Sequence, residues 1–365
     1  MKNINKVIII FLGVLFIFSG LIKLNDPMGT AIKLEEYFDI FAEDFASFFH
    51  FFSSYALPLA VFVTSLEVIL GLALLVGFKL RYIILAMLGL IIFFTFLTFY
   101  SAYFDKVTDC GCFGDAIPLD PWQSFYKDVV LTVLILVLVS QLKSFSNSAK
   151  IISKITMGSS VVFCMVLAWY VLNYLPVIDF RDYKVGNSIP QLMQPQAPCQ
   201  YEYIMEKDGE TFVFDTYPTD KSYEFKDMNI VNEKECMAKI MDYNLIDTDG
   251  QDFTQESLLG KKLFVVVHKV KDTDLHVYEE LSALVGAAEN AGITPMVLTS
   301  EGGNFEEFRH QVQLAAPYYF TDETVLKAMV RYNPGILLLE DGVVQGKWSG
   351  KAIPSPDELQ SLLSQ

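Results

Sequence analysis

The segment ALPLAVFVTSLEVILGLALLVG, residues 56–77, decides the fold class of the N-terminal half of the chain. It is apolar over a length that can cross a bilayer, which takes roughly 17–25 helical residues. Glu67 is its single ionisable residue. Because a charge inside a membrane span is costly, such a residue indicates a functional site. We expect Glu67 to be paired, protonated or hydrogen-bonded to a ligand.

Further apolar runs of similar length occur at about residues 7–24, 82–104, 126–142 and 155–177. Because the first run is N-terminal, it could alternatively be a secretory signal peptide. No small-x-small cleavage site follows it, so retention as a helix is favoured. The sequence therefore predicts five membrane spans, in line with a composition that is 52% hydrophobic and only 19% charged.

Basic residues predict the orientation of these spans, because they concentrate in cytoplasmic loops. They lie at the N-terminus and in the loops at 78–81 and 143–154, whereas the loops at 25–55 and 105–125 are acidic. We therefore expect a bacterial inner-membrane protein with a cytoplasmic N-terminus and residues 178–365 in the periplasm. Membrane lipid is then an obligatory partner.

The two halves of the chain differ in charge. Residues 1–177 carry 11 basic and 12 acidic side chains, whereas the rest of the chain carries 16 and 31. No basic stripe is present, which argues against nucleic acid as a partner. The acidic half is also unsuited to docking on an anionic membrane surface.

For the periplasmic half we predict a linker and a small β-rich segment at 179–242, followed by an α/β domain at 243–365. In the first part, YEYIMEKDGETFVFD predicts a hairpin turned on Asp208 and Gly209. In the second part, strands and helices alternate and end in a hairpin and a helix. This order resembles the thioredoxin-like fold, and NLIDTDGQDFTQESLLGKKLFVVV is similar to the entry to its thiol-reductase branch.

The resemblance implies a C-x-x-C pair after the first central strand, but residues 268–274 contain no cysteine. Pro334 lies where the family keeps its cis-proline, so the resemblance implies a peptide-binding surface there. Because thiol exchange requires a thiolate, we expect this domain to act in binding or stability. His268 and His276 are not at metal-ligand spacing, and we predict no metal site.

Two of the five cysteines lie in the motif DCGCFGD, residues 109–115. Cys110 and Cys112 form a redox pair, a structural pair or part of a metal site, and the residues alone leave these readings open. A disulfide across one residue is strained and therefore oxidising, which favours the redox reading. Asp109 and Asp115 act against it, since nearby carboxylates raise the pKa of a thiol.

Cys199 and Cys236 are the cysteines of the periplasmic half and are candidates for a structural disulfide. Within the membrane half, Lys23 is a candidate partner for Glu67. The segment LEEYFDIFAEDFASFFHFF, residues 34–52, predicts an amphipathic helix in the outer interface. We expect this helix to cover the bundle near the cysteine motif.

The motifs FSGLIKLNDP, LEVILG and DCGCFGD, in this order, resemble the DoxX/MauE superfamily of four-helix membrane proteins. The resemblance implies a bundle at 1–145, to which a fifth helix at 146–178 is added. It also implies quinone-coupled redox chemistry or disulfide formation in a periplasmic partner, with Cys110 and Cys112 as the matching cysteines.

Two functions follow as hypotheses. In the first, the chain is a quinone-linked membrane thiol oxidoreductase that uses Cys110 and Cys112, assisted by Glu67 and Lys23. In the second, it is a non-enzymatic envelope assembly or scaffold protein whose thioredoxin-like domain binds a partner near Pro334.

Overall fold

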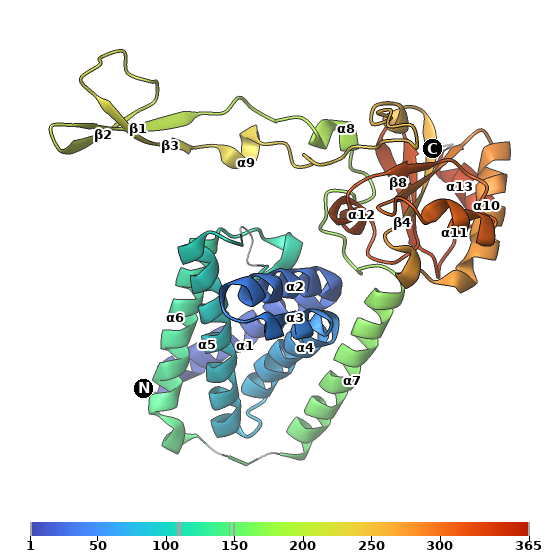
Figure 1. The fold of residues 1–365 in the computed structure, drawn as a ribbon. Helices are drawn as coiled ribbons and strands as arrows, with labels where there is room; N and C mark the ends of the chain where they lie inside the picture. Colours follow the sequence, from blue (N-terminus) through green and yellow to red (C-terminus); the bar gives the residue numbers. More distant parts are fainter. Residues whose placement is uncertain (1, 108–110, 146, 149, 364–365) are drawn as a thin grey trace. The chain divides into compact units, whose positions relative to one another are not determined.

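The computed structural model describes residues 2–107, 111–145, 147–148 and 150–363 (Figure 1). The chain divides into two compact units, Met1–Phe180 and Arg181–Gln365. The first unit ends three residues after residue 177, the end predicted for the fifth span. The segment 179–242, which we expected to stand between two domains, belongs to the second unit.

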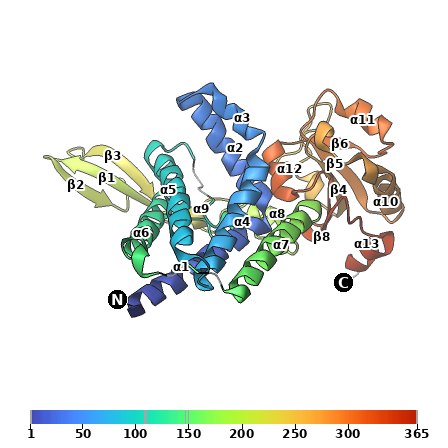
Figure 2. The same ribbon diagram turned by 90° about the horizontal axis from the view of Figure 1, so that it is seen from below.

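The first unit is an α-helical bundle, and the described residues contain five helices long and apolar enough to cross a membrane. Figure 2 views this bundle from below. The five predicted long apolar helices are present. The helices are α1 (Lys2–Asn25), α4 (Ala56–Leu75), α5 (Leu80–Phe104), α6 (Pro121–Ser140) and α7 (Ile151–Asn173).

An apolar core joins α1, α4, α5 and α6. Leu12 and Leu74 meet Met87 and Ile135 in this core, and each is almost fully buried. The exposed side chains of the same helices are also largely apolar, so residue type alone does not distinguish the core from the outer face. Close packing and satisfied polar groups then hold the helices together.

An additional helix of 18 residues lies between the first two spans. Asp26 ends α1 and caps α2 (Pro27–Asp44), because its carboxylate accepts a hydrogen bond of 3.1 Å from the backbone N–H of Gly29. Pro27 fits the first position of that helix, where no hydrogen-bonded N–H is needed. Two short helical turns follow, η1 (Ser47–Phe49) and α3 (His50–Ser53).

The second unit contains a three-stranded antiparallel sheet with strand order β2-β1-β3, which we call the arm. Its strands are β1 (Tyr201–Lys207), β2 (Glu210–Phe214) and β3 (Glu224–Ile230). The predicted hairpin turn is present, and both Asp208 and Gly209 have positive φ. The third strand was not predicted separately, since EFKDMNI lacks an alternating apolar pattern. Cys199 and Cys236 form a disulfide at the base of the arm.

The main sheet of this unit has the strand order β6-β5-β4-β7-β8. β4 pairs in parallel with β5 and antiparallel with β7, and the peptide bond before Pro334 is cis. This arrangement confirms the predicted thioredoxin-like fold. The strands are β4 (Lys261–Val267), β5 (Thr294–Thr299), β6 (Tyr318–Phe320), β7 (Gly335–Glu340) and β8 (Val343–Ser349).

Helices cover both faces of this sheet. Alternate residues of β4 pack with three helices, whereas Phe264 and Val266 point to the opposite face, from which α12 (Glu323–Met329) contacts β4. The three helices are α10 (Tyr278–Asn290), α11 (Phe305–Gln311) and α13 (Pro356–Leu362).

The remaining helical turns of the two units are η2 (Gly114–Ala116), η3 (Leu142–Ser144), α9 (Glu233–Cys236), η4 (Glu256–Leu258), η5 (Val270–Asp272) and η6 (Leu275–Val277).

Part of the predicted linker at 178–200 is integrated into this sheet. The backbone N–H of Gly186 donates to the carbonyl of Val344 at 2.8 Å, and that of Ile189 donates to Gly342 at 2.9 Å. Ile189 begins α8 (Ile189–Leu192) and is fully buried. The segment thereby covers the edge of β8, which would otherwise expose unpaired backbone groups.

Candidate functional site

Glycines bring α1 and α4 into close contact. A Cβ atom on Gly20 would lie 2.9 Å from the carbonyl oxygen of Thr64, and one on Gly71 would lie 2.7 Å from that of Gly13. These distances leave no room for a side chain, so glycine is required for the approach of the two backbones. The approach places the end of α1 against the middle of α4.

Lys23 and Glu67 form a buried ion pair at this contact, as the residues themselves suggested. Their side chains are only 6% and 3% exposed. Lys23 Nζ pairs with one carboxylate oxygen of Glu67, and the hydroxyl of Ser19 donates to the other at 2.9 Å. Lys23 Nζ also lies 4.6 Å from the ring centre of Phe94, at the distance of a cation–π contact.

The cysteine loop is joined to this ion pair through Ser19. The same hydroxyl also donates to the backbone carbonyl of Cys112 at 3.2 Å. The hydroxyl proton of Ser19 is thus shared between the cysteine loop and the Glu67 carboxylate. Cys112 is half-buried and carries a free thiol. A second ion pair, between Lys127 Nζ and Asp128 Oδ1 at 2.6 Å, belongs to the same region.

The second ion pair is held by α5 and by the loop. Thr98 donates to Asp128 Oδ2 at 3.1 Å, and Lys127 Nζ lies 5.2 Å from the ring of Phe113, next to Cys112. One buried ion pair, one partly buried ion pair and one thiol thus gather at the end of the bundle where α1 ends and α6 begins. We call Ser19, Lys23, Glu67, Cys112, Lys127 and Asp128 the polar cluster.

The structure places only part of the DCGCFGD motif. Asp109 and Cys110 lie outside the described residues. Gly111 has φ of +61°, which favours glycine, and a Cβ there would lie 3.5 Å from Cγ of Lys33 on α2. Asp115 is exposed on η2. α2 therefore lies close to the cysteine loop. The single helix predicted at 34–52 is wrong, because α2 ends at Asp44 and η1 and α3 follow it.

Burial raises the pKa of the Cys112 thiol above its usual value. The Lys127 ammonium opposes this shift, whereas the Asp128 carboxylate adds to it. The thiol is therefore mostly protonated near neutral pH, and Lys127 is the nearby charge that favours thiolate formation most.

Replacing Lys127 with glutamine is expected to raise the pKa of Cys112 further. Since alkylation requires the thiolate, the rate of reaction with a maleimide at pH 7.5 should fall about three- to tenfold. Lys127→Arg keeps the charge and should stay within about twofold of the wild type. An unchanged or faster rate in Lys127→Gln would show that Lys127 does not act on this thiol.

In the second unit, Asp274 lies beside the cis-proline loop. Its backbone N–H donates to the carbonyl of Asn333 at 3.1 Å, and the Tyr332 hydroxyl donates to its carboxylate at 2.8 Å. Burial acts to raise the pKa of Asp274, but hydrogen bonds from Tyr332 and the His276 backbone outweigh it and lower the pKa. A carboxylate thus stands at the loop where the resemblance would require thiols.

His268, which we expected to be an ordinary loop residue, is buried at the end of β4 and only 7% exposed. Burial lowers the pKa of its imidazole to about 4. Its backbone N–H donates to Asn333 Oδ1 at 3.2 Å, which fixes it next to the cis-proline loop. No local pattern indicates this burial, because the apolar run of β4 ends at Val267.

The stability of the second unit is expected to fall as the pH is lowered from about 6.5 to about 4. The unfolded chain binds a proton on His268 below its ordinary pKa, whereas the folded unit does not bind it until about pH 4. The loss is at most roughly 3 kcal/mol. Denaturation followed by Trp348 fluorescence in a Trp122→Phe/Trp169→Phe background measures it, and His268→Gln should flatten the pH dependence.

The comparisons with known proteins bear on both units. Residues 1–141 match the family model described as methylamine utilisation protein MauE. The N-terminal bundle is therefore similar to the MauE family over this range. The resemblance to MauE is confirmed over these residues, whereas the resemblance to DoxX stays a prediction. All six members of the polar cluster lie within the matched MauE region.

A solved structure is similar to the second unit. It is a secreted Mycobacterium tuberculosis disulfide oxidoreductase described as homologous to E. coli DsbE, with 17% identity and a TM-score of 0.27. The match covers 34% of this chain and 95% of that chain. We assign the thioredoxin-like fold from the strand order and not from this match. No curated protein matches the chain.

Proposed function

We propose that the chain is a membrane thiol oxidoreductase in which Cys110 and Cys112 cycle between dithiol and disulfide. The observation that carries the proposal is the Ser19 hydroxyl, which joins the cysteine loop to the Lys23–Glu67 ion pair. A buried carboxylate, two amines and a thiol offer sites that hold and move protons while thiols are oxidised. The MauE-family match supports a membrane-associated redox or disulfide function in general.

The proposed reaction is balanced by a membrane quinone. The two thiols lose two protons and two electrons and form one S–S bond, while the quinone gains them and becomes a quinol. A periplasmic dithiol protein then reduces the Cys110–Cys112 disulfide by exchange and is itself oxidised. In this proposal Lys127 favours the thiolate of Cys112, while Glu67 and Lys23 hold protons near the quinone.

The proposed location is a bacterial inner membrane with the cysteine loop on the periplasmic side. The distribution of basic residues supports this orientation, because Lys79, Arg81 and Lys143 lie at the opposite ends of the spans. A membrane-impermeant thiol reagent should then label the loop in intact spheroplasts. Labelling only after lysis would reverse the orientation.

Thiol trapping in isolated membranes tests the redox proposal. After reduction, a chain-bearing quinone should protect both Cys110 and Cys112 from a maleimide, and dithiothreitol should restore both labels, as read by mass spectrometry of the loop peptide. Cys110→Ser should abolish the protection of Cys112, whereas Cys164→Ser, a control within α7, should leave it intact. If Cys112 reacts equally before and after quinone, the proposal is wrong.

A second function, partner binding by the thioredoxin-like unit, has its own support. Asp274 is half-buried beside the loop of Pro334, whose own side chain is buried, and no cysteine follows Cys236 in the chain. This favours recruitment of an envelope protein near Pro334 over catalysis there. A complex that is captured from membranes, and that survives Cys112→Ser but not Asp274→Lys, would support a scaffold role.

A further inference from the structure

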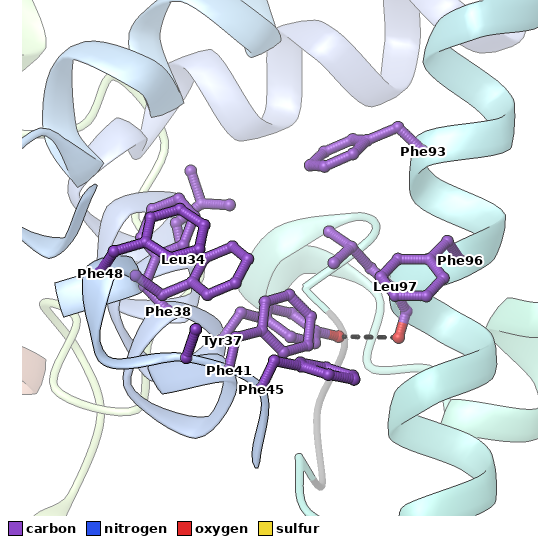
Figure 3. A pocket seen from close by; sticks show the side chains of 11 residues that line it. Leu34, Tyr37, Phe38, Phe41, Phe45, Phe48, Phe93, Phe96 and Leu97 are labelled. Atoms are coloured by element: carbon purple, nitrogen blue, oxygen red, sulfur yellow. Dashed lines mark hydrogen bonds between the residues drawn. The ribbon is translucent and has the colours of Figure 1, made fainter. Parts of the chain in front are cut away.

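A wide apolar pocket opens between α2, η1 and α5, at the end of the bundle that carries the cysteine loop. Its volume is about 520 Å³, within the range of sites for drug-sized ligands. Figure 3 shows rings from α2 on one side and Phe93, Phe96 and Leu97 of α5 on the other. The pocket is lined by Leu34, Tyr37, Phe38, Phe41, Phe45, Ala46, Phe48, Phe49, Phe93, Phe96 and Leu97.

The surface that lines the pocket consists of carbon atoms only. Tyr37 is its one residue with a polar side-chain group, and its hydroxyl is already hydrogen-bonded to Ser101 and to the carbonyl of Leu97. The rings also support one another, since Phe41 packs edge-on against Tyr100 at 5.0 Å and against Phe49 at 5.6 Å. A polar head group would lose its hydration here without compensation, so the pocket suits a hydrocarbon chain.

The mouth of the pocket is also apolar. Phe45 and Phe48 are 61% and 60% exposed, and Phe93 and Phe96 are 42% and 49% exposed. α5 is a membrane-spanning helix, so these rings border the lipid. A chain that is dissolved in the bilayer therefore reaches the pocket sideways, without crossing water.

The back of the pocket adjoins the polar cluster through one ring. Phe93 lines the pocket and lies 5.6 Å from Phe94, and Phe94 in turn lies 4.6 Å from Lys23 Nζ. The next turn of α5 repeats the pattern, because Leu97 lines the pocket while Thr98 binds Asp128. The pocket and the polar cluster thus lie on neighbouring faces of α5.

We infer that this pocket holds the prenyl chain of the quinone that accepts electrons from the cysteine pair. The inference rests on the proposed function and adds where the oxidant binds. It also adds a selectivity: the site takes quinones with a long hydrocarbon chain and discriminates against those without one. Each buried methylene contributes about 0.8 kcal/mol, or about fourfold in affinity, so the chain dominates binding.

The first experiment compares two quinones with the same ring, one with a decyl chain and one without, on the protein in proteoliposomes. The chain-bearing quinone should half-oxidise the cysteine pair at a concentration at least tenfold lower. Ala46→Trp fills the pocket and should remove this advantage, while oxidation by the chainless quinone is unchanged. The matched control is Ala86→Trp, at an exposed position of α5 outside the pocket, which should behave as the wild type.

The second experiment needs no variant and therefore does not depend on how Ala46→Trp folds. A quinone with a diazirine in its chain is photolysed on the wild-type protein, and the labelled peptides are sequenced. Label in residues 34–49 and 93–97, competed by the decyl quinone, is expected. Label spread over other lipid-facing helices overturns the inference.

The outcomes separate the two proposals. If the pocket peptides are labelled but neither quinone oxidises the cysteines, the pocket binds the chain and the proposed function fails. If both quinones oxidise the cysteines equally well in the wild type, the function stands and the pocket inference fails. If native mass spectrometry shows that Ala46→Trp releases a phospholipid while quinone selectivity is unchanged, the pocket is a lipid acyl-chain site, and the inference is wrong.

Discussion

Replacing Glu67 with leucine is expected to lower the free energy of unfolding by about 3–5 kcal/mol, because it leaves the ammonium of Lys23 buried without its partner. Both side chains are nearly inaccessible, and the ring of Phe94 alone cannot replace a carboxylate. Lys23→Met should cost a similar amount, since it leaves the carboxylate of Glu67 with only the Ser19 hydroxyl. Unfolding in mixed detergent micelles measures both values.

The double variant Lys23→Met/Glu67→Leu distinguishes stability from function. Removing both charges from a buried pair is often neutral or stabilising, so most of the lost stability should return. Oxidation of the cysteine pair by quinone should not return, because the proton-holding groups are gone. Lys33 and Glu36, a pair about one third exposed at 3.2 Å, provide the control, and removing either should cost less than about 1 kcal/mol. A double variant with wild-type redox rates would exclude Lys23 and Glu67 from the chemistry.

The second large effect is expected at the base of the arm. The disulfide joins residues separated by 37 positions, and the loop-entropy relation gives about 4 kcal/mol for a loop of this length. The arm has little else to stabilise it, because Met205 is the only buried residue among the described side chains of β1, β2 and β3. Cys199→Ala/Cys236→Ala should therefore unfold the arm and leave the main sheet intact.

Hydrogen exchange measures this effect strand by strand. In the double variant, amides of residues 201–230 should exchange at least a hundredfold faster, while amides of β4 and β5 should keep their protection. Cys164→Ala removes a buried thiol from α7 and serves as the control, with no change in the arm. Unchanged protection of β1 in the disulfide-free protein would contradict the prediction.

The sequence could predict the elements of this protein better than their contacts. Apolar runs of sufficient length identify five spans, and strand–helix alternation identifies the thioredoxin-like sheet, because both signals are local. The pair of Lys23 and Glu67 could also be proposed, since a charge inside a span needs a partner. Which faces of the helices meet depends on packing, and no local pattern encodes it.

The site illustrates this limit. Ser19 is one hydroxyl among many in the membrane helices, and only the position of the cysteine loop gives it a role. Lys127 and Asp128 could be read equally well as interfacial residues at the start of a span. Their burial against Thr98 follows from the contact of α5 with α6. The arm was partly missed for the opposite reason, since β3 has almost no buried face and therefore no pattern to detect.

Helix α2 adjoins both the cysteine loop and the aromatic pocket. On α2, Lys33 lies against Gly111 of the cysteine loop, whereas its neighbours Leu34 and Tyr37 form the wall of the aromatic pocket. Lys33 and Tyr37 are four residues apart and therefore lie on one face of α2. Under the two proposals, this face contacts both the cysteine loop and the hydrocarbon chain of the oxidant. α2 then sets the spacing between the thiol pair and its oxidant.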